Sequence, residues 1–386
     1  MAELGGGRRG QLTSSGLRPG WTTGACATAG ATAAYTALLQ GEFPDPVIVL
    51  LPQNRQPSFA LTSHELAGGR AAAAITKDSG DDPDVTHGAV VHAAVWPGPP
   101  GGGVRFVAGE GVGTVTLPGL PLPPGEPAIN PGPRAMIVAN LRRVAGLAAT
   151  DPDPDVVVQV SIAAGAKLAQ RTLNPRLGIV GGLSVLGTTG VVVPYSCSAW
   201  IDSIRRGVDV ARALGHDHVA GCTGSTSERV ARELYGLPET ALLDMGDFAG
   251  AVLKYLRRQP LARLTICGGV GKLAKLADGH LDLHSARSRV DVGFLTRLAE
   301  QAGATAEVAA RVAGSTTALA AIETCAAAGV PLGDKIAQAA RDFALEVLAG
   351  APVAVDVVCI DRAGQLVGRS RRAGPGTPAR GANDPG

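Results

Sequence analysis

The sequence predicts two domains of mixed helix and strand that divide near Pro194, and three observations lead to this prediction. The chain has 386 residues, more than one hydrophobic core usually organises. Up to Pro194, short apolar strands are separated by loops rich in Gly, Pro and Thr, a pattern typical of a mixed domain. From Ser198 onward helical and strand patterns alternate, which favours an α/β domain with a parallel sheet.

The composition excludes several classes of protein. Apolar residues make up 45% of the chain, and the net charge of +2 is too balanced for a nucleic-acid footprint. Aromatic residues at 3% also disfavour stacking on single-stranded bases. The six cysteines are scattered without C-x-x-C spacing, and the chain has neither a secretory apolar region nor a run of 18 apolar residues. We therefore expect a cytoplasmic protein without a membrane span or a protein-bound metal.

The first domain is expected to follow residues 1–16, which are rich in Gly, Ser and Arg and predict a disordered N-terminus. A Gly/Thr loop leads into an Ala-rich helix over 27–39. Thr22 and Thr23 at its start suit either an anion-binding helix terminus or an ordinary N-cap. Further strands are expected over 47–51, 89–96, 104–108 and 156–162, a strand or short helix over 70–77, and a helix over 134–145.

The most polar stretch is the segment 77–88, KDSGDDPDVTHG, which is called the acidic loop below. Gly80 and Pro83 rule out a regular helix, because Gly costs backbone entropy and Pro lacks an amide donor. Such a loop is either a solvated turn or a functional site on a rigid scaffold.

The second domain shows a helix–strand alternation from Ser198 to Ile360. Helices are expected over 198–214, 225–235, 248–257, 290–302, 305–328 and 332–348, with another from Leu273. Strands are expected from His218, over 241–244, over 264–267 and over 353–360, before a flexible tail over 364–386.

Three of these strands end in residues that suit a ligand. In an open parallel sheet, ligands bind at the carboxyl ends of the strands, close to glycines and to an acid that can hold a ribose. Asp244 lies 23 residues after Gly221, near the usual offset of such an acid. We therefore expect a nucleoside-bearing cofactor at Gly221, Thr223, Gly224, Asp244, Gly268 and Gly269. The alternative is that these residues only form structural turns.

Five motifs in series carry a resemblance to a known family. They are WTTGACA (21–27), KDSGDDPDVT (77–86), GEGVGTVT (109–116), EPAINP (126–131) and GTTGVVVP (187–194). Together they closely resemble the CbiD family, the cobalt-precorrin-5B C1-methyltransferases of the anaerobic cobalamin pathway. The chain departs from the family's pattern at 244–248 and 268–272.

The resemblance implies an N-terminal α+β domain over 17–194 that cradles the substrate, and a Rossmann-like three-layer α/β cofactor domain over 195–363. It implies S-adenosylmethionine as methyl donor and an anionic cobalt-corrinoid as acceptor, which is methylated at C1 to cobalt-precorrin-6A. Cobalt arrives within the substrate, so no protein metal site is required. A homo-oligomer and transient contacts with other enzymes of the pathway stay open.

These implications assign roles to residues of the first domain. An anionic macrocycle favours cations and hydroxyls, so the candidate substrate-binding residues are Arg18, Thr22, Thr23, Lys77 and Arg134. Methylation at carbon leaves a proton to remove, so the candidate catalytic bases are Asp81, Asp82, Asp84 and His87. The alternative is that these acids only hold the loop through turns and backbone hydrogen bonds.

Three other functions fit parts of the sequence. An NAD(P)-linked oxidoreductase would use Asp244 to bind ribose. A non-catalytic corrinoid-binding protein would bind pigment without methyl transfer, and a metal-dependent hydrolase would place a divalent ion at the acidic loop.

Overall fold

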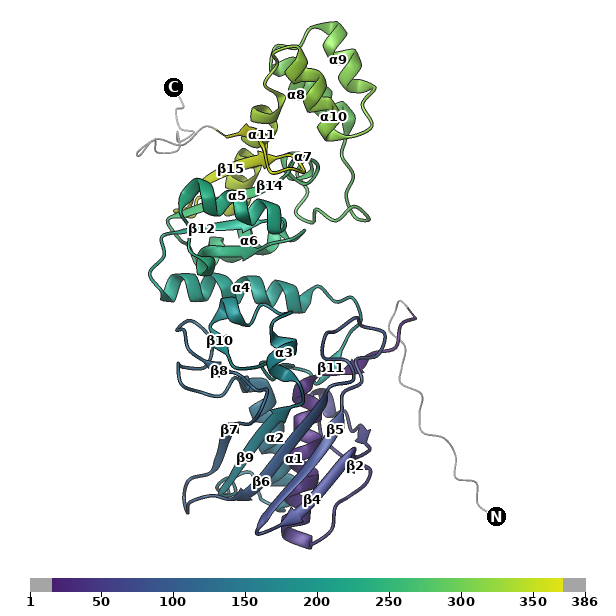
Figure 1. Cartoon of the computed structure of the whole chain (residues 1–386), viewed down its shortest axis with the longest axis vertical. Helices are drawn as coiled ribbons and strands as arrows, with labels where there is room; N and C mark the ends of the chain where they lie inside the picture. Colours follow the sequence, from purple (N-terminus) through teal and green to yellow (C-terminus); the bar gives the residue numbers. More distant parts are fainter. Residues whose placement is uncertain (1–15, 371–386) are drawn as a thin grey trace, which may run out of the picture. The chain divides into compact units, whose positions relative to one another are not determined.

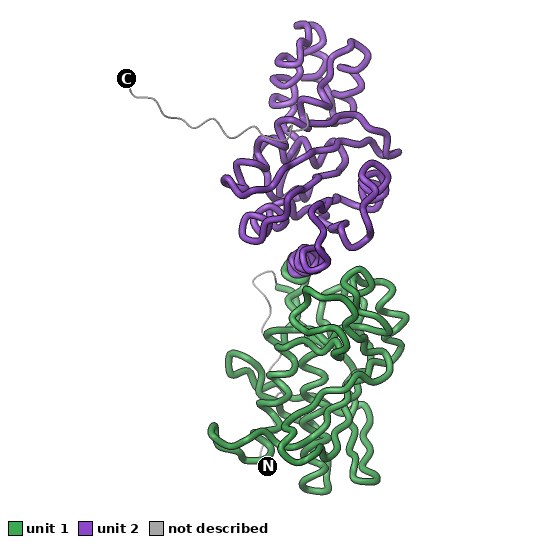
Figure 2. The backbone as a smooth tube through the Cα atoms, turned by 90° about the vertical axis from the view of Figure 1, so that its left-hand side faces the viewer, with its two compact units in different colours: residues 1–199 green, residues 200–386 purple. Residues whose placement is uncertain are grey.

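The computed structural model describes residues 16–370 of the chain. The fold divides into two units, Met1–Ala199 and Trp200–Gly386 (Figure 2), each with its own core of buried apolar side chains. The expected disordered segment 1–16 therefore lies outside the described residues except for Gly16, and so does the end of the expected tail.

Unit 1 is built on a five-stranded sheet with the order β4-β5-β6-β9-β7, antiparallel except for the β7–β9 pair (Figure 1). Its strands are β4 (Ser63–Ala67), β5 (Arg70–Thr76), β6 (Val90–Pro97), β7 (Val104–Ala108) and β9 (Val156–Ile162). Three strand pairs flank it: β1 (Gly20–Trp21) with β11 (Val191–Val192), β2 (Val47–Ile48) with β3 (Ser58–Phe59), and β8 (Thr114–Val115) with β10 (Ile179–Val180).

Helix α1 (Thr23–Gln40) forms the centre of unit 1, where it contacts β5, β6 and helix α2 (Pro131–Val144). Its small side chains allow this close packing, since a Cβ on Gly30 would lie 3.0 Å from the Ala73 carbonyl oxygen. The buried hydroxyls of Thr28 and Thr32 donate to the carbonyls four residues earlier, so neither hydroxyl is left unpaired. A short helix, α3 (Gly165–Ala169), follows β9.

Unit 2 contains a second five-stranded sheet with the order β13-β12-β14-β15-β16, parallel except for β16. Its strands are β12 (His218–Cys222), β13 (Leu242–Asp244), β14 (Arg263–Gly269), β15 (Ala354–Ile360) and β16 (Leu366–Arg369). Its helices are α4 (Ser198–Ala213), α5 (Ser225–Tyr235), α6 (Ala249–Arg258), α7 (Val270–Ala277), α8 (Val292–Gln301), α9 (Ala306–Ala313), α10 (Ala318–Ala327) and α11 (Leu332–Leu348).

Two expectations about these elements are wrong, and a third needs new bounds. The single helix expected over 305–328 is two helices, because Thr317 caps a new one by accepting the Ala320 N–H at 3.1 Å. Part of the tail expected from 364 is ordered, since β16 pairs with β15. The strand expected over 264–267 continues to Gly269, and the helix expected from Leu273 already begins at Val270.

Candidate functional site

The five motifs meet at one end of the unit 1 sheet. The acidic loop joins β5 to β6 at this end, and the β6–β9 register, which pairs Val91 with Ile162, places the end of β9 there too. The chain before α1 joins them, because the Trp21 N–H donates to the Asp78 carbonyl at 2.7 Å. Figure 1 shows β8, β10 and β11 at the same end. Residues far apart in sequence therefore form one surface.

Gly20, directly before the first motif, and Gly80, within the second, explain how these two motifs come so close. A Cβ on Gly20 would lie 2.0 Å from the Ser79 carbonyl carbon. Gly80 has a φ of +68°, and a Cβ there would lie 2.2 Å from the Arg18 carbonyl oxygen. Only glycine is compatible with both approaches, so the contact of β1 with the acidic loop depends on these residues.

Lys77 and Asp84 form a buried ion pair inside the acidic loop. The Lys77 ammonium donates to Asp84 Oδ2 at 2.7 Å and to Ser79 Oγ at 2.5 Å, and the lysine is 2% exposed. Asp84 Oδ1 accepts both the N–H and the hydroxyl of Thr86. Burial raises the pKa of the Asp84 carboxyl, but the bonds and charge of Lys77 together with the Thr86 bonds outweigh it and hold that pKa below its usual value.

These contacts correct two expectations. Lys77 is too deeply buried to meet a substrate carboxylate, and Asp84 is held as a carboxylate by its partners rather than poised to take a proton. Both residues fold the acidic loop.

Arg18 and Asp78 form a second ion pair, with bonds of 2.5 and 2.9 Å between the guanidinium and the two carboxylate oxygens. The hydrogen bond from Arg18 is the largest cause that lowers the pKa of the Asp78 carboxyl. Asp81 Oδ2 accepts the backbone N–H of Arg18 at 2.7 Å. The Arg18 side chain remains 48% exposed, so it can still meet a ligand. Asp78 was not among the expected site residues, because its partner lies 60 residues away in sequence.

Asp82 and His87 contact two further segments. Asp82 Oδ1 accepts the Tyr195 N–H at 2.8 Å, which fastens the acidic loop to the segment after β11. His87 is exposed, and its Nδ1 accepts the Ser79 N–H at 3.1 Å. A neutral imidazole in this arrangement carries its proton on Nε2, so it offers a donor rather than a lone pair. This arrangement favours a hydrogen-bond donor at His87, and the role of a base stays a prediction.

The remaining expected substrate contacts have structural partners. Thr22 is the N-cap of α1 and accepts the Ala25 N–H at 3.1 Å, so the N-cap interpretation is confirmed for it. Thr23 is buried, and its Oγ1 accepts the Leu186 N–H at 3.1 Å. Arg134 donates to the Ile129 carbonyl at 2.7 Å and to Glu126 at 2.8 Å within the EPAINP motif. Thr23 and Arg134 therefore hold the motifs together and are not directed at a ligand.

A further property of this end suits a large, flat ring. The segment 186–195 exposes apolar side chains, with Leu186, Val193 and Tyr195 at 47%, 50% and 65%. The surface thus combines donors with an apolar face.

In unit 2, the residues expected to hold a cofactor lie at the carboxyl ends of three neighbouring strands. Cys222, the last residue of β12, is paired with Asp244 on one side and with Cys267 on the other. The strand order reverses at β12, because the chain moves from it to β13 on one side and then to β14 on the other. Ligands of open α/β sheets bind at such a point.

The four glycines at these strand ends do not have the same role. A Cβ on Gly221 would lie 3.2 Å from the Met245 sulfur, and one on Gly268 would lie 2.6 Å from Thr223 Cγ2. These two glycines are packed by the protein, and the expectation that they contact a cofactor is corrected. A Cβ on Gly224 or Gly269 would meet nothing within 4 Å, so the backbone there is open to a ligand.

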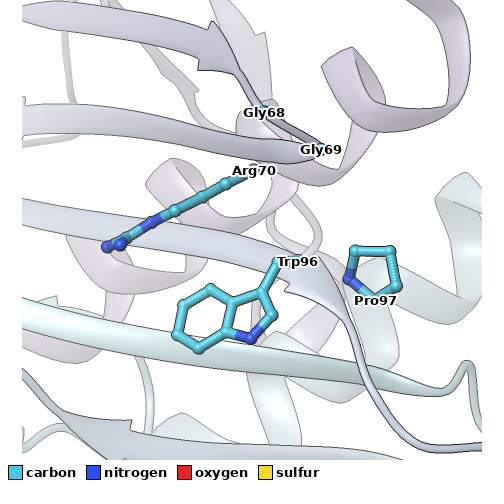
Figure 3. A pocket seen from close by; sticks show the side chains of 5 residues that line it. All are labelled: Gly68, Gly69, Arg70, Trp96 and Pro97. Atoms are coloured by element: carbon cyan, nitrogen blue, oxygen red, sulfur yellow. The ribbon is translucent and has the colours of Figure 1, made fainter.

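A separate pocket of about 470 Å³ lies at the opposite end of the unit 1 sheet (Figure 3). It is lined by Gly68, Gly69, Arg70, Trp96 and Pro97. The Arg70 guanidinium lies 4.9 Å from the centroid of the Trp96 ring and donates to Gln159. None of the expected site residues lines this pocket.

Within residues 16–370, no helix is both long enough and apolar enough to cross a membrane. The same residues contain no group of three or more His, Cys, Asp or Glu side chains arranged to hold a metal ion.

The structure defines a two-domain protein of mixed helix and strand, with one candidate site in each unit. The CbiD profile matches residues 11–194, and that of the CbiD C-terminal domain matches residues 282–371. The cobalt-precorrin-5B C(1)-methyltransferase of Brucella anthropi is 56% identical over 92% of this chain and 95% of its own length. That of a Bradyrhizobium species is 56% identical over 92% of this chain and 93% of its own. The chain therefore belongs to the CbiD family.

A crystal structure of a cobalamin biosynthesis protein, CbiD, from Archaeoglobus fulgidus is 26% identical to the chain. It matches 66% of this chain and 77% of its own, with a TM-score of 0.36.

Proposed function

We propose that the protein is a cobalt-precorrin-5B C(1)-methyltransferase of cobalamin biosynthesis that uses S-adenosylmethionine as its methyl donor. The observation that carries this proposal is the 56% identity, over 92% of the chain, to relatives that bear this name. The convergence of the five motifs on one surface of unit 1 supports it independently.

We infer that the corrinoid binds at the motif end of unit 1. Its carboxylate side chains suit the exposed guanidinium of Arg18 and the Nε2–H of His87. The flat ring suits the apolar side chains of Leu186, Val193 and Tyr195. Donors around an apolar face would fix the orientation of the ring. Alignment of the two reactants provides most of the rate enhancement that we expect for this group transfer.

Asp81 and Asp82 remain the candidate bases. Each uses one carboxylate oxygen, Oδ2 of Asp81 and Oδ1 of Asp82, to hold a neighbouring backbone N–H. The other oxygen of either residue can accept the proton that the ring carbon loses after methylation.

Unit 2 is proposed to be a Rossmann-like domain that binds S-adenosylmethionine. The steps from β12 to β13 and from β13 to β14 run in opposite directions across the sheet. Right-handed crossovers then place α5 on one face and α6 on the other. The contacts of α11 with both α6 and α7 agree with a second helical layer on that other face.

The strand ends of unit 2 suit this donor. The open backbone at Gly224 and Gly269 leaves room for a nucleoside. Asp244 ends β13 and lies 23 residues after Gly221, near the usual sequence offset of an acid that binds ribose. When bound, S-adenosylmethionine supplies a methyl group on a sulfonium centre. The residues of the chain need only hold it, orient it and exclude water.

The remaining assignments follow from composition and burial. None of the six cysteines, all within residues 16–370, forms a disulfide, and five of them are buried, which suits the reducing cytoplasm. Cobalt is part of the substrate, so the proposal requires no protein ligands for a metal. We also propose that the protein associates with itself and makes transient contacts with other enzymes of the pathway.

Incubation with methyl-labelled S-adenosylmethionine and cobalt-precorrin-5B tests the function. We expect label in the tetrapyrrole, a mass gain of one methyl group, and stoichiometric S-adenosylhomocysteine. A folded protein that binds both compounds and transfers no label would contradict the activity and favour a corrinoid-binding role.

A further inference from the structure

Lys272 and Asp247 lie where three strand ends of unit 2 meet. Lys272 is in the first turn of α7, directly after β14, and its ammonium donates to the Thr223 carbonyl, just past β12, at 3.1 Å. The same ammonium lies 3.1 Å from Asp247 Oδ1, in the loop after β13. One cation therefore reaches the ends of all three strands.

Several features indicate that this pair meets a ligand. Asp247 Oδ1 is buried and, among residues 16–370, has no hydrogen-bond partner of good geometry, despite its charge contact with Lys272. The Asp247 side chain as a whole is 23% exposed, so its carboxylate can still face a ligand although Oδ1 is buried. The Lys272 side chain is 35% exposed, and its ammonium has three donors. Neighbouring Gly269 and Gly271 leave the space beside it open.

We propose that Lys272 and Asp247 together hold the amino-acid end of S-adenosylmethionine, with the ligand carboxylate on Lys272 and the ligand ammonium on Asp247. The proposal rests on the proposed function, which makes S-adenosylmethionine the ligand of unit 2. The carboxylate is the only anionic group of that molecule, so it is the group that a lysine at the strand ends would select. The ligand ammonium then pairs with the exposed part of the Asp247 carboxylate, whose side chain is 23% exposed.

The competing explanation is that the pair only braces the three strand ends. A brace would be indifferent to the chemistry of the ligand, whereas the proposed contacts require particular ligand groups. Ligands that lack one group at a time therefore separate the two explanations.

The test measures binding by calorimetry with the full-length protein and three thioethers. S-adenosylhomocysteine has both charged groups, its decarboxylated analogue keeps only the ammonium, and 5′-methylthioadenosine has neither. For the wild type we expect S-adenosylhomocysteine to bind about 10-fold or more tightly than 5′-methylthioadenosine, as charged hydrogen bonds typically give.

Two variants assign the groups. Lys272→Gln should weaken S-adenosylhomocysteine about 10-fold and leave the other two ligands within about twofold, because only the first carries a carboxylate. Asp247→Asn should weaken both ligands that carry an ammonium and spare 5′-methylthioadenosine. Lys254→Gln, at an exposed lysine on α6, is the matched control and should change nothing.

Each outcome has a distinct meaning. Equal loss for all three thioethers in both variants, or wild-type binding that ignores the amino-acid end, would overturn the assignment while leaving the methyltransferase proposal intact. Failure of the folded wild type to bind any of the three would instead contradict the proposed donor, and the assignment with it. Thermal unfolding of each variant separates loss of binding from loss of folding.

Discussion

Lys77 and Asp84 show how a polar loop can be largely structural. Their ion pair is nearly inaccessible to water on the lysine side, so removing the aspartate leaves an uncompensated buried charge. We expect Asp84→Asn to lower the free energy of unfolding by about 3 kcal/mol in urea denaturation. Asp81→Asn, at an exposed carboxylate, should cost less than about 1 kcal/mol. Equal losses would show that the Lys77–Asp84 pair does not hold the loop.

The same pair predicts a pH dependence. Because the pKa of Asp84 is lower in the folded protein, the stability it contributes is complete above the unfolded value, about 3.9, and is lost as the pH falls through the folded value. The stability difference between the wild type and Asp84→Asn should therefore be constant near neutrality and shrink below about pH 4. A stability difference that grows on acidification would show that folding raises the pKa of Asp84 instead of lowering it.

His87 offers a matched pair of variants. His87→Asn would keep an acceptor for the Ser79 N–H but lose the Nε2 donor, whereas His87→Gln would keep a donor near Nε2 and lose the loop bond. If His87 donates to the substrate, His87→Asn should raise KM for the corrinoid about 10-fold with little change in kcat, and His87→Gln should mainly lower stability. A fall of about 100-fold or more in kcat for both would restore the role of a base.

At the scale of elements, two glycine substitutions should have opposite effects. Gly80→Ala combines a φ of +68° with a clash against the Arg18 carbonyl, so we expect thermal unfolding several degrees lower. Gly271→Ala adds a Cβ to helix α7 where nothing lies within 4 Å, and should stabilise the protein by about 0.5–1 kcal/mol. A neutral Gly80→Ala would mean that the contact of β1 with the acidic loop is dispensable.

The elements that the sequence predicts best are those with strong local patterns. The strands at 104–108 and 156–162 and the helices at 225–235 and 332–348 are confirmed with the same bounds. The two-residue strands and β16 form because they pair with other segments of the chain. The local pattern of apolar and polar residues does not reveal such pairing. Part of the candidate site was hidden for the same reason, since Asp82 and Tyr195 are 113 residues apart.

The sequence indicates segments that the structure brings together, but not the contacts of each side chain. Composition located the acidic loop and the strand-end glycines. It could not show that Lys77 is buried, that His87 accepts a backbone N–H, or that Gly221 packs against Met245, because burial and tautomer are set by the fold.

At the scale of the whole molecule, the cysteines provide a probe of both cores. Five of the six are buried, and burial raises the pKa of Cys26 and Cys267 to about 12, so their thiolates do not form near neutrality. We expect one thiol, Cys197, to react rapidly with a disulfide reagent in the native protein, and all six after denaturation. Two or more fast thiols before unfolding would show that a core is open.

We propose a division of labour, in which unit 1 receives the corrinoid and unit 2 holds the methyl donor at its strand ends. Hydrogen–deuterium exchange of the full-length protein with and without S-adenosylhomocysteine tests it most directly. We expect slower exchange in peptides that cover 222–227, 244–248 and 268–275, and little change in the acidic loop. Protection confined to unit 1, at 77–88 or 186–195, would contradict the claim.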